Sequence, residues 1–221
     1  MVVAIPLFER MTALDAVGPY EVIWRVPGVE VKFVAERTGP IRSDRPLGLI
    51  ADYSFDDLPD PDVVLVPGGS FTQQMVEDEA LVGWVAGAHQ GSLYTTSVCT
   101  GALVLGKAGV LQGLDATTHW AVGYQLAEYG ATYLPERVVE RGKVITGAGV
   151  SAGIDMALTL ATRLSADYTA EAIQLLIQYD PKPPYNTGEP GTTPQSIRDY
   201  ASALHEYNEE GGPVPQPPPS G

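Results

Sequence analysis

The sequence contains a single cysteine, only three histidines and comparatively few charged residues, and each scarcity excludes a class of protein. One cysteine cannot form an intrachain disulfide or an all-cysteine zinc site, and three scattered histidines argue against a structural metal site. Charged residues make up 18% of the chain and hydrophobic residues 44%, so a sizeable buried core is expected rather than disorder. The 221 residues fit one ordinary domain.

Basic residues are also scarce, because 13 Lys and Arg stand against 27 Asp and Glu, which gives a net charge of −14. Such an acidic protein repels phosphate groups, so we expect no nucleic-acid partner and no docking on anionic membranes. No apolar run approaches the roughly 20 residues of a membrane helix. Residues 1–6 place no basic residue before their apolar stretch, unlike a secretory signal. These features predict a cytoplasmic location.

Short apolar segments alternate with segments of helical spacing along most of the chain. This alternation predicts an α/β fold, a mainly parallel sheet flanked by helices on both faces. The segments 138–139 and 144–145 predict a hairpin, and Pro19 predicts the start of the first helix. The expected strands are 2–8, 29–35, 62–67 and 92–98, and the expected further helices are 72–90, 100–108, 154–164 and 170–177.

The character of the sequence changes after Tyr179, where several prolines follow one another. One more helix is expected over 193–208. Residues 209–221 are rich in proline and glycine and cannot contribute to a core, so they predict a flexible tail. The sequence therefore predicts a single α/β domain over 1–208 and a tail over 209–221.

The only cysteine, Cys99, stands at a predicted junction between a strand and a helix. The run Ser97-Val98-Cys99-Thr100-Gly101 has the small–x–nucleophile–x–Gly spacing of a nucleophile elbow. The small neighbours allow a tight turn with an uncommon backbone geometry. The N–H groups of the following helix would point at the sulfur and lower the pKa of the thiol. Cys99 is therefore a candidate nucleophile, although a lone cysteine is often an ordinary buried residue.

Asp15 follows the first predicted strand, at the edge of the sheet where Cys99 is also expected. Two interpretations remain open from the residues alone. Asp15 either caps the helix that follows it or lies near the sulfur as a neutral acid, because burial and a nearby negative charge both favour protonation.

Two further segments carry candidate site residues. The glycines of Pro67-Gly68-Gly69-Ser70 would let backbone N–H groups approach a bound atom, or would form a plain tight turn. His119 is either a general base for Cys99 or a structural residue. Trp120 either lines a substrate pocket or fills the core.

These segments together resemble the DJ-1/PfpI superfamily, and the resemblance covers about residues 2–180. Within it the chain is most similar to the isocyanide hydratase branch. The segments that carry this similarity are Leu14-Asp15 with Gly18-Pro19, Thr96-Ser97-Val98-Cys99-Thr100-Gly101, Leu103-Val104-Leu105-Gly106, Ala116-Thr117-Thr118-His119-Trp120, Glu136-Arg137-Val138-Val139 and 152–161. The resemblance implies a flavodoxin-like fold and a homodimer.

The resemblance also implies a reaction, the hydration of an isocyanide to an N-substituted formamide through a cysteine thioimidate. Cys99 would be the nucleophile, Asp15 its acid partner, and Thr100 would hold Asp15 or the reacting water. Gly69, Ser70, His119 and Trp120 would bind the substrate, and no metal or organic cofactor is expected. Asp15 stands where glyoxalase III-like relatives have Glu. Thr100 stands where proteases of the superfamily have His. The alternatives are such a glyoxalase-type hydratase or a non-enzymatic, redox-sensing DJ-1-like protein.

Overall fold

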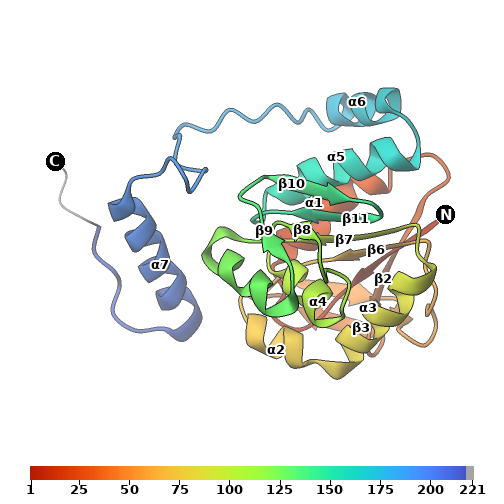
Figure 1. Ribbon diagram of the computed structural model, residues 1–221, viewed down its shortest axis with the longest axis horizontal. Coiled ribbons are helices and arrows are strands. Elements are labelled where there is room, and N and C mark those ends of the chain that lie inside the picture. Colours follow the sequence, from red (N-terminus) through yellow and green to blue (C-terminus); the bar gives the residue numbers. More distant parts are fainter. Residues whose placement is uncertain (218–221) are drawn as a thin grey trace. The chain divides into compact units, whose positions relative to one another are not determined.

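The computed structural model describes residues 1–217, without the side chains of Thr72, Gln73, Glu209 and Glu210. Contacts divide the chain into two compact units, Met1–Tyr179 and Asp180–Gly221. The first unit contains a seven-stranded sheet in the order β10-β11-β7-β6-β1-β2-β5 (Figure 1). Its strands are β1 (Val2–Pro6), β2 (Glu30–Ala35), β5 (Tyr53–Ser54), β6 (Val63–Val66), β7 (Tyr94–Val98), β10 (Val138–Arg141) and β11 (Val144–Gly147).

Every neighbouring pair in this sheet is parallel except β10 and β11, which form the predicted hairpin. Helices cover both faces of the sheet, with α1, α5 and α6 on one side and α2, α3 and α4 on the other (Figure 1). The α/β prediction is therefore confirmed. The helices are α1 (Ala13–Ile23), α2 (Thr72–Glu77), α3 (Glu79–Gly91), α4 (Gly101–Lys107), the 3-10 helix η1 (Trp120–Tyr129), α5 (Ala152–Leu164) and α6 (Asp167–Leu176). Two small sheets join β3 (Gly39–Arg42) to β4 (Gly48–Ala51), and β8 (Asp115–Ala116) to β9 (Thr132–Tyr133).

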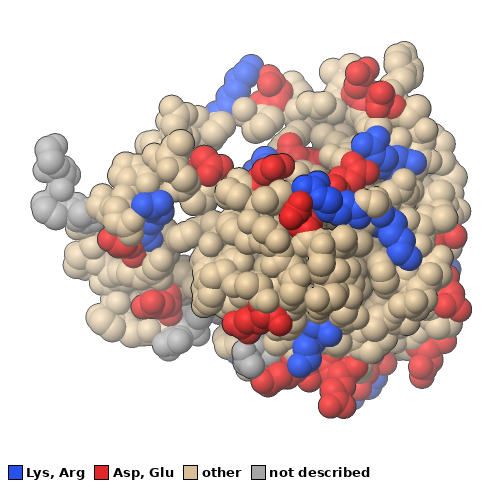
Figure 2. Space-filling view, in the orientation of Figure 1, with Lys and Arg blue, Asp and Glu red and all other residues tan. Residues whose placement is uncertain are grey.

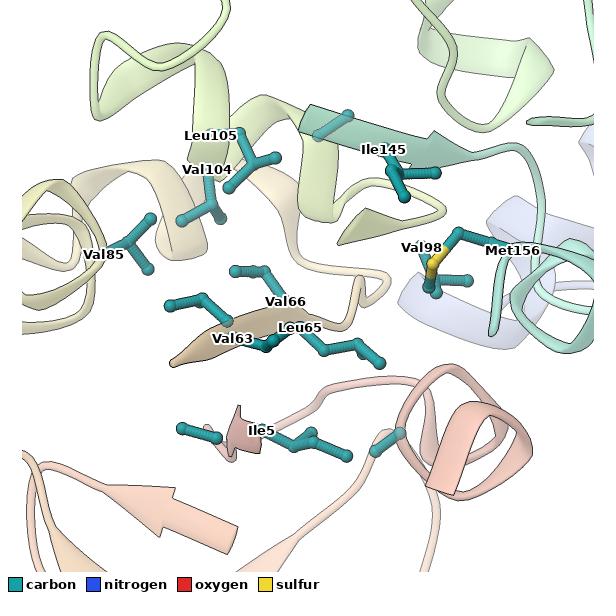
Figure 3. Packing of buried hydrophobic residues seen from close by; sticks show 14 of the residues in the cluster. Ile5, Val63, Leu65, Val66, Val85, Val98, Val104, Leu105, Ile145 and Met156 are labelled. Atoms are coloured by element: carbon teal, nitrogen blue, oxygen red, sulfur yellow. The ribbon is translucent and has the colours of Figure 1, made fainter. Parts of the chain in front are cut away.

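The core lies on both faces of the central strands. All four residues of β6 are buried, as expected for a strand that is covered on both sides. Figure 3 shows Val85 of α3 and Val104 of α4 on one side, and Val98 and Met156 on the other. Burying such side chains contributes about 1.5–3 kcal/mol each, which fixes the positions of the strand ends that carry the candidate site.

Two predicted helix boundaries are wrong. Helix α1 begins at Ala13, so Pro19 lies inside it. Proline costs a helix interior about 3 kcal/mol, but α1 packs closely on α5, and tertiary packing contributes most of the stability of helices in proteins. The single helix expected over 72–90 is divided at Asp78, whose carboxylate accepts a hydrogen bond from the N–H of Leu81 at 2.9 Å and caps α3.

The second unit contains α7 (Gln195–Glu210), close to the predicted helix. The hydroxyl of Tyr200 donates a hydrogen bond to the carbonyl of Pro215 at 3.4 Å. The single domain over 1–208 and the flexible tail over 209–221 stay predictions, and residues 218–221 lie outside the described residues.

Within the described part of the chain, no helix is both long and apolar enough to cross a membrane.

Candidate active site

The candidate site lies where the strand order reverses. The chain leaves β1 for β2 on one side of it, and then returns to place β6 and β7 on its other side. Ligand sites in open α/β sheets occur at such a switch point, outside the carboxyl ends of the strands. The loop into α1 follows β1, the turn of Gly68 and Gly69 follows β6, and Cys99 follows β7. The fold thus brings three predicted segments to one edge of the sheet.

Cys99 has the left-handed backbone conformation expected of a nucleophile elbow, with φ of 56°. Its N–H donates to the carbonyls of Gly147 and Ala148 at 3.1 and 2.8 Å. Its carbonyl accepts a hydrogen bond from the hydroxyl of Thr118 at 2.8 Å. Non-glycine residues in this region are strained, and the three bonds hold the strained turn in place. The predicted turn is confirmed, and Thr118, which was not among the expected site residues, positions it.

The turn is packed so tightly that two glycines are required. A Cβ atom on Gly101 would overlap the carbonyl oxygen of Val66. A Cβ atom on Gly68 would lie 2.6 Å from the nitrogen of Thr100 and 3.0 Å from Oδ2 of Asp15. The glycine after β6 therefore lets the elbow and the first helix approach each other.

Asp15 is completely buried in the first turn of α1. Its Oδ2 accepts a hydrogen bond from the N–H of Gly68 at 3.0 Å, and its Oδ1 has no N–H or O–H partner among the described residues. Thr12 occupies the N-cap position of α1, so the capping interpretation of Asp15 is wrong. The carboxyl instead lies next to the thiol of Cys99, whose interaction with it affects the pKa of both groups.

The pKa of Asp15 is raised from 3.8 to about 7. Burial is the largest cause, because removal from water disfavours the charged form, and the negative charge of Asp44 adds to it. The hydrogen bonds from Gly68 and Cys99 act in the opposite direction. Asp15 can therefore hold or release a proton near neutral pH, as a general acid and base must.

The thiol of Cys99 does not have the lowered pKa that the sequence predicts. The residue is 5% exposed, and burial raises the thiol pKa, followed by the charge of Asp15. The N–H groups of Thr100 and Val150 favour the thiolate, but they do not outweigh the loss of water. When Asp15 is ionised, Cys99 is therefore a neutral thiol, and its proton is available to the carboxylate.

Thr100 contacts the turn after β6 rather than Asp15, contrary to expectation. Its hydroxyl donates to the carbonyl of Gly69 and accepts from the N–H of Gly69, both at 2.9 Å. The N–H of Gly69 is thus engaged with Thr100, and a role of Gly69 and Ser70 in substrate binding stays a prediction. Ser70 follows as a half-buried residue. The N–H groups directed at sulfur belong instead to Thr100 and Val150, and Val150 carried no sequence signal.

His119 and Trp120 lie next to each other at the start of η1, with ring centroids 5.7 Å apart. Nδ1 of His119 accepts a hydrogen bond from the N–H of Ala121 at 3.4 Å, and its ring packs against Gly149. Both side chains are half-buried. The groups that shift the thiol pKa include Asp15, so the carboxyl is a partner of the sulfur.

Among the described residues, no group of three or more His, Cys, Asp and Glu side chains could hold a metal ion.

Comparison with known proteins shows what the whole chain resembles. Residues 1–163 match the model of the DJ-1/PfpI family. The chain is 43% identical over 195 residues to a Pseudomonas putida protein named isonitrile hydratase, a match that covers 88% of this chain and 86% of the relative.

Two further proteins are similar to the chain, one through its crystal structure and one through its sequence. A crystal structure of a ThiJ/PfpI family protein from Pseudomonas syringae superposes with a TM-score of 0.87 at 33% identity, covering 95% of this chain and 89% of that one. A Caenorhabditis elegans protein named glutathione-independent glyoxalase is 23% identical over 139 residues, which are 62% of this chain and 74% of the relative. The matched family model spans most of the first unit, including Asp15, Cys99 and Val150. The chain therefore belongs to the DJ-1/PfpI family.

Proposed function

We propose that this protein is an isocyanide hydratase, which adds water to an isocyanide to give an N-substituted formamide. The 43% identity to an isonitrile hydratase over most of both chains supports this activity. The observation that carries the mechanism is the buried contact between the Cys99 thiol and the carboxyl of Asp15, whose pKa is about 7. Isocyanide and isonitrile are two names for the same functional group.

In the first half of the reaction, the sulfur of Cys99 attacks the terminal carbon of R–N≡C. The thiol proton passes to the Asp15 carboxylate as the carbon–sulfur bond forms, and Asp15 then donates it to the same carbon. The product is a thioimidate, R–N=CH–S–Cys99, which contains all the atoms of the isocyanide and the thiol. Because Asp15 removes the proton while the sulfur attacks, the thiol does not have to ionise beforehand. This suits a thiol whose pKa is raised by burial.

In the second half, water adds to the thioimidate carbon. Asp15 accepts one proton from this water, and the other passes from the added oxygen to the substrate nitrogen, which gives R–NH–CH(O⁻)–S–Cys99. The tetrahedral intermediate then collapses, the carbon–sulfur bond breaks, and the proton held by Asp15 returns to sulfur. The formamide R–NH–CHO leaves, and Cys99 and Asp15 regain their starting states. A single carboxyl with a pKa of about 7 suits both directions of transfer.

The surrounding residues position this pair. The N–H groups of Thr100 and Val150 stabilise negative charge that develops on sulfur. Thr100 fixes Gly69 through its hydroxyl, and Gly68 fixes Asp15. We assign Gly69, Ser70, His119 and Trp120 to the surroundings of the bound isocyanide. The reaction as written needs no metal or organic cofactor.

The homodimer implied by the family resemblance, the absence of a nucleic-acid partner and the cytoplasmic location stay predictions. Sedimentation velocity of the full chain tests the first of them. A monomer at micromolar concentration would contradict the homodimer.

The direct test is to incubate the protein with an aryl isocyanide and to follow formamide by ultraviolet absorbance and mass spectrometry. We expect multiple turnovers by the unmodified chain, none by Cys99→Ala, and unchanged circular dichroism in the variant. Quenched samples should contain Cys99 increased in mass by one isocyanide. Methylglyoxal serves as the second substrate, and turnover of methylglyoxal without turnover of the isocyanide would overturn the proposal in favour of a glyoxalase.

A further inference from the structure

A cavity opens on the same edge of the sheet as the candidate site, beyond the ends of β1 and β2. It encloses about 240 Å³. Its deepest residues, Leu7, Met75 and Leu81, are buried. Neither Cys99 nor Asp15 is among its lining residues. The cavity is therefore separate from the candidate active site, and nothing in the proposed reaction uses it.

The side walls of this cavity are aromatic. Phe8, Phe55 and Phe71 line it, and they come from three different segments of the chain. Phe55 stacks on Trp84 with ring centroids 4.9 Å apart, and the indole N–H of Trp84 donates to the carbonyl of Leu58 at 2.9 Å. These contacts fix the ring before any ligand arrives. A preformed apolar cavity with a few polar groups at its mouth is the usual form of a small-molecule site.

The mouth of the cavity is acidic. Glu9 and Glu36 are exposed there and Asp78 is half-buried, against the cations of Arg37 and of Arg10, which lies over Phe71. Asp78 also accepts a hydrogen bond from the N–H of Leu81, which leaves Glu9 and Glu36 as the more available carboxylates. Acidic side chains gather along the edge of the first unit below α2 and β3 (Figure 2). The local charge and the net charge of −14 both favour a cation and oppose an anion.

One of the aromatic walls already binds a cation within the protein. The guanidinium of Arg10 lies over the ring of Phe71, with its carbon 3.4 Å from the ring centroid. The electron-rich face of an aromatic ring attracts a positive charge, and this attraction increases where water is excluded. The contact with Arg10 shows that the ring of Phe71 attracts a positive charge.

We propose that this cavity binds a small organic cation with an apolar body, an arylalkyl- or branched-alkylammonium ion of about ten non-hydrogen atoms. The body lies between the rings of Phe8, Phe55 and Phe71, and the ammonium group lies at the mouth near Glu9 and Glu36. The volume limits the size of the ligand, the aromatic walls select the body, and the acidic mouth selects the charge. This inference does not depend on the proposed hydratase activity.

The test is a titration of the ¹⁵N-labelled full chain with benzylammonium, followed by amide chemical shifts. Benzyl alcohol and benzoate serve as neutral and anionic probes of the same shape. We expect benzylammonium to shift amides of the lining segments, around residues 7–9, 35–37 and 74–78. It should bind at least about tenfold more tightly than benzyl alcohol, and benzoate more weakly still. Equal binding of the three probes, shifts elsewhere, or no saturable shift up to 10 mM would overturn the proposal.

Two variants and a matched control test the residues. Glu36→Gln should weaken benzylammonium about fivefold or more without changing the affinity for benzyl alcohol. Gln74→Trp places a large side chain at the mouth from an exposed position and should abolish both. Glu128→Gln removes the same charge from an exposed position on η1, outside the cavity lining, and should leave both affinities unchanged. If Glu36→Gln and Glu128→Gln behaved alike, the assignment of the acidic mouth would be wrong.

Discussion

Two carboxylates in the first unit, Asp15 and Glu140, have opposite surroundings. Asp15 is completely buried, accepts a hydrogen bond from one backbone N–H, lies next to a thiol and has a raised pKa. Glu140 on β10 is bound by both Nε and Nη2 of Arg163, at 2.8 and 2.9 Å, at the protein surface. The hydrogen bonds from Arg163 lower its pKa. The two groups have the same chemistry, and their surroundings move their pKa values apart.

The comparison teaches that this fold uses carboxylates in two ways. Where a carboxylate meets a guanidinium in water, it stays ionised and contributes little to stability. Where it is buried beside a thiol with no cation, it destabilises the folded state and gains the ability to exchange protons at neutral pH. Five predictions on four variants test this contrast, in order of decreasing effect.

The largest effect is expected from Asp15→Asn. Loss of the proton carrier should lower kcat/KM for an aryl isocyanide by about 10³-fold. In the unmodified protein kcat/KM should rise with pH through about 7, because Asp15 must be ionised to accept the thiol proton. In Asp15→Asn this rising limb of the plot of kcat/KM against pH should disappear. A near-normal rate or an unchanged limb in Asp15→Asn would remove Asp15 from the chemistry.

Asp15→Asn should also change stability in a direction set by linkage. The folded-state pKa of about 7 lies above the unfolded value near 3.8, so the folded state binds more protons between these values. The contribution of Asp15 to stability therefore falls as pH rises from 4 to 7, by as much as about 4 kcal/mol. Urea unfolding at several pH values should show this slope in the unmodified chain and its loss in the variant.

The next effect is expected from Gly68→Ala. The added Cβ would lie 2.7 Å from Oγ1 of Thr100 as well as close to Asp15, so both must move. We expect a loss of about 1–3 kcal/mol of stability and about 10²-fold in kcat/KM. Gly87→Ala in α3 is the control, because nothing lies within 4 Å of its added Cβ. The control should be neutral or stabilising by up to about 1 kcal/mol.

Thr100→Val should have a smaller effect on the rate. It leaves both the N–H and the carbonyl of Gly69 without their partner, which costs about 1–3 kcal/mol of stability. We expect kcat/KM to fall about tenfold, as Gly69 and its neighbour Gly68 lose their fixed positions. Thr100→Ser retains the hydroxyl and should restore most of the rate. Equal losses in Thr100→Val and Thr100→Ser would contradict a specific role of the hydroxyl.

The smallest effect is expected from Glu140→Gln. Its ion pair with Arg163 is solvent-exposed, so removal should cost at most about 1 kcal/mol in urea unfolding and leave kcat/KM unchanged. The lowered pKa means that this contribution is present at neutral pH and is lost as pH falls through the folded-state value. A change in rate comparable to that of Asp15→Asn would erase the distinction between the two carboxylates.

The fold and the meeting of the site segments could be predicted from the sequence, because both follow from patterns of side chains. The apolar run of β6, the Cys99 elbow and the hairpin of β10 and β11 all have local signatures. The start of α1 could not be predicted from the sequence, because packing against α5 outweighs the local preference of Pro19.

The pKa shifts in the site also could not be predicted from the sequence. The sequence shows a helix after Cys99 and predicts a lowered thiol pKa, but it does not show how completely the sulfur is removed from water. The partners of Thr100 and the contribution of Val150 involve backbone groups. Every residue except proline carries the same N–H, so such contacts leave no trace in residue identity.

This dependence on the main chain has a consequence for mutational scanning. Apart from the thiol of Cys99, the hydrogen-bond donors that shift the pKa values of the reacting pair are the amides of Gly68, Thr100 and Val150. Exchanging one side chain for another leaves each amide in place, so an alanine scan would report Val150 as unimportant even if its N–H supports the chemistry. Replacing single amides by esters through chemical ligation would reveal them.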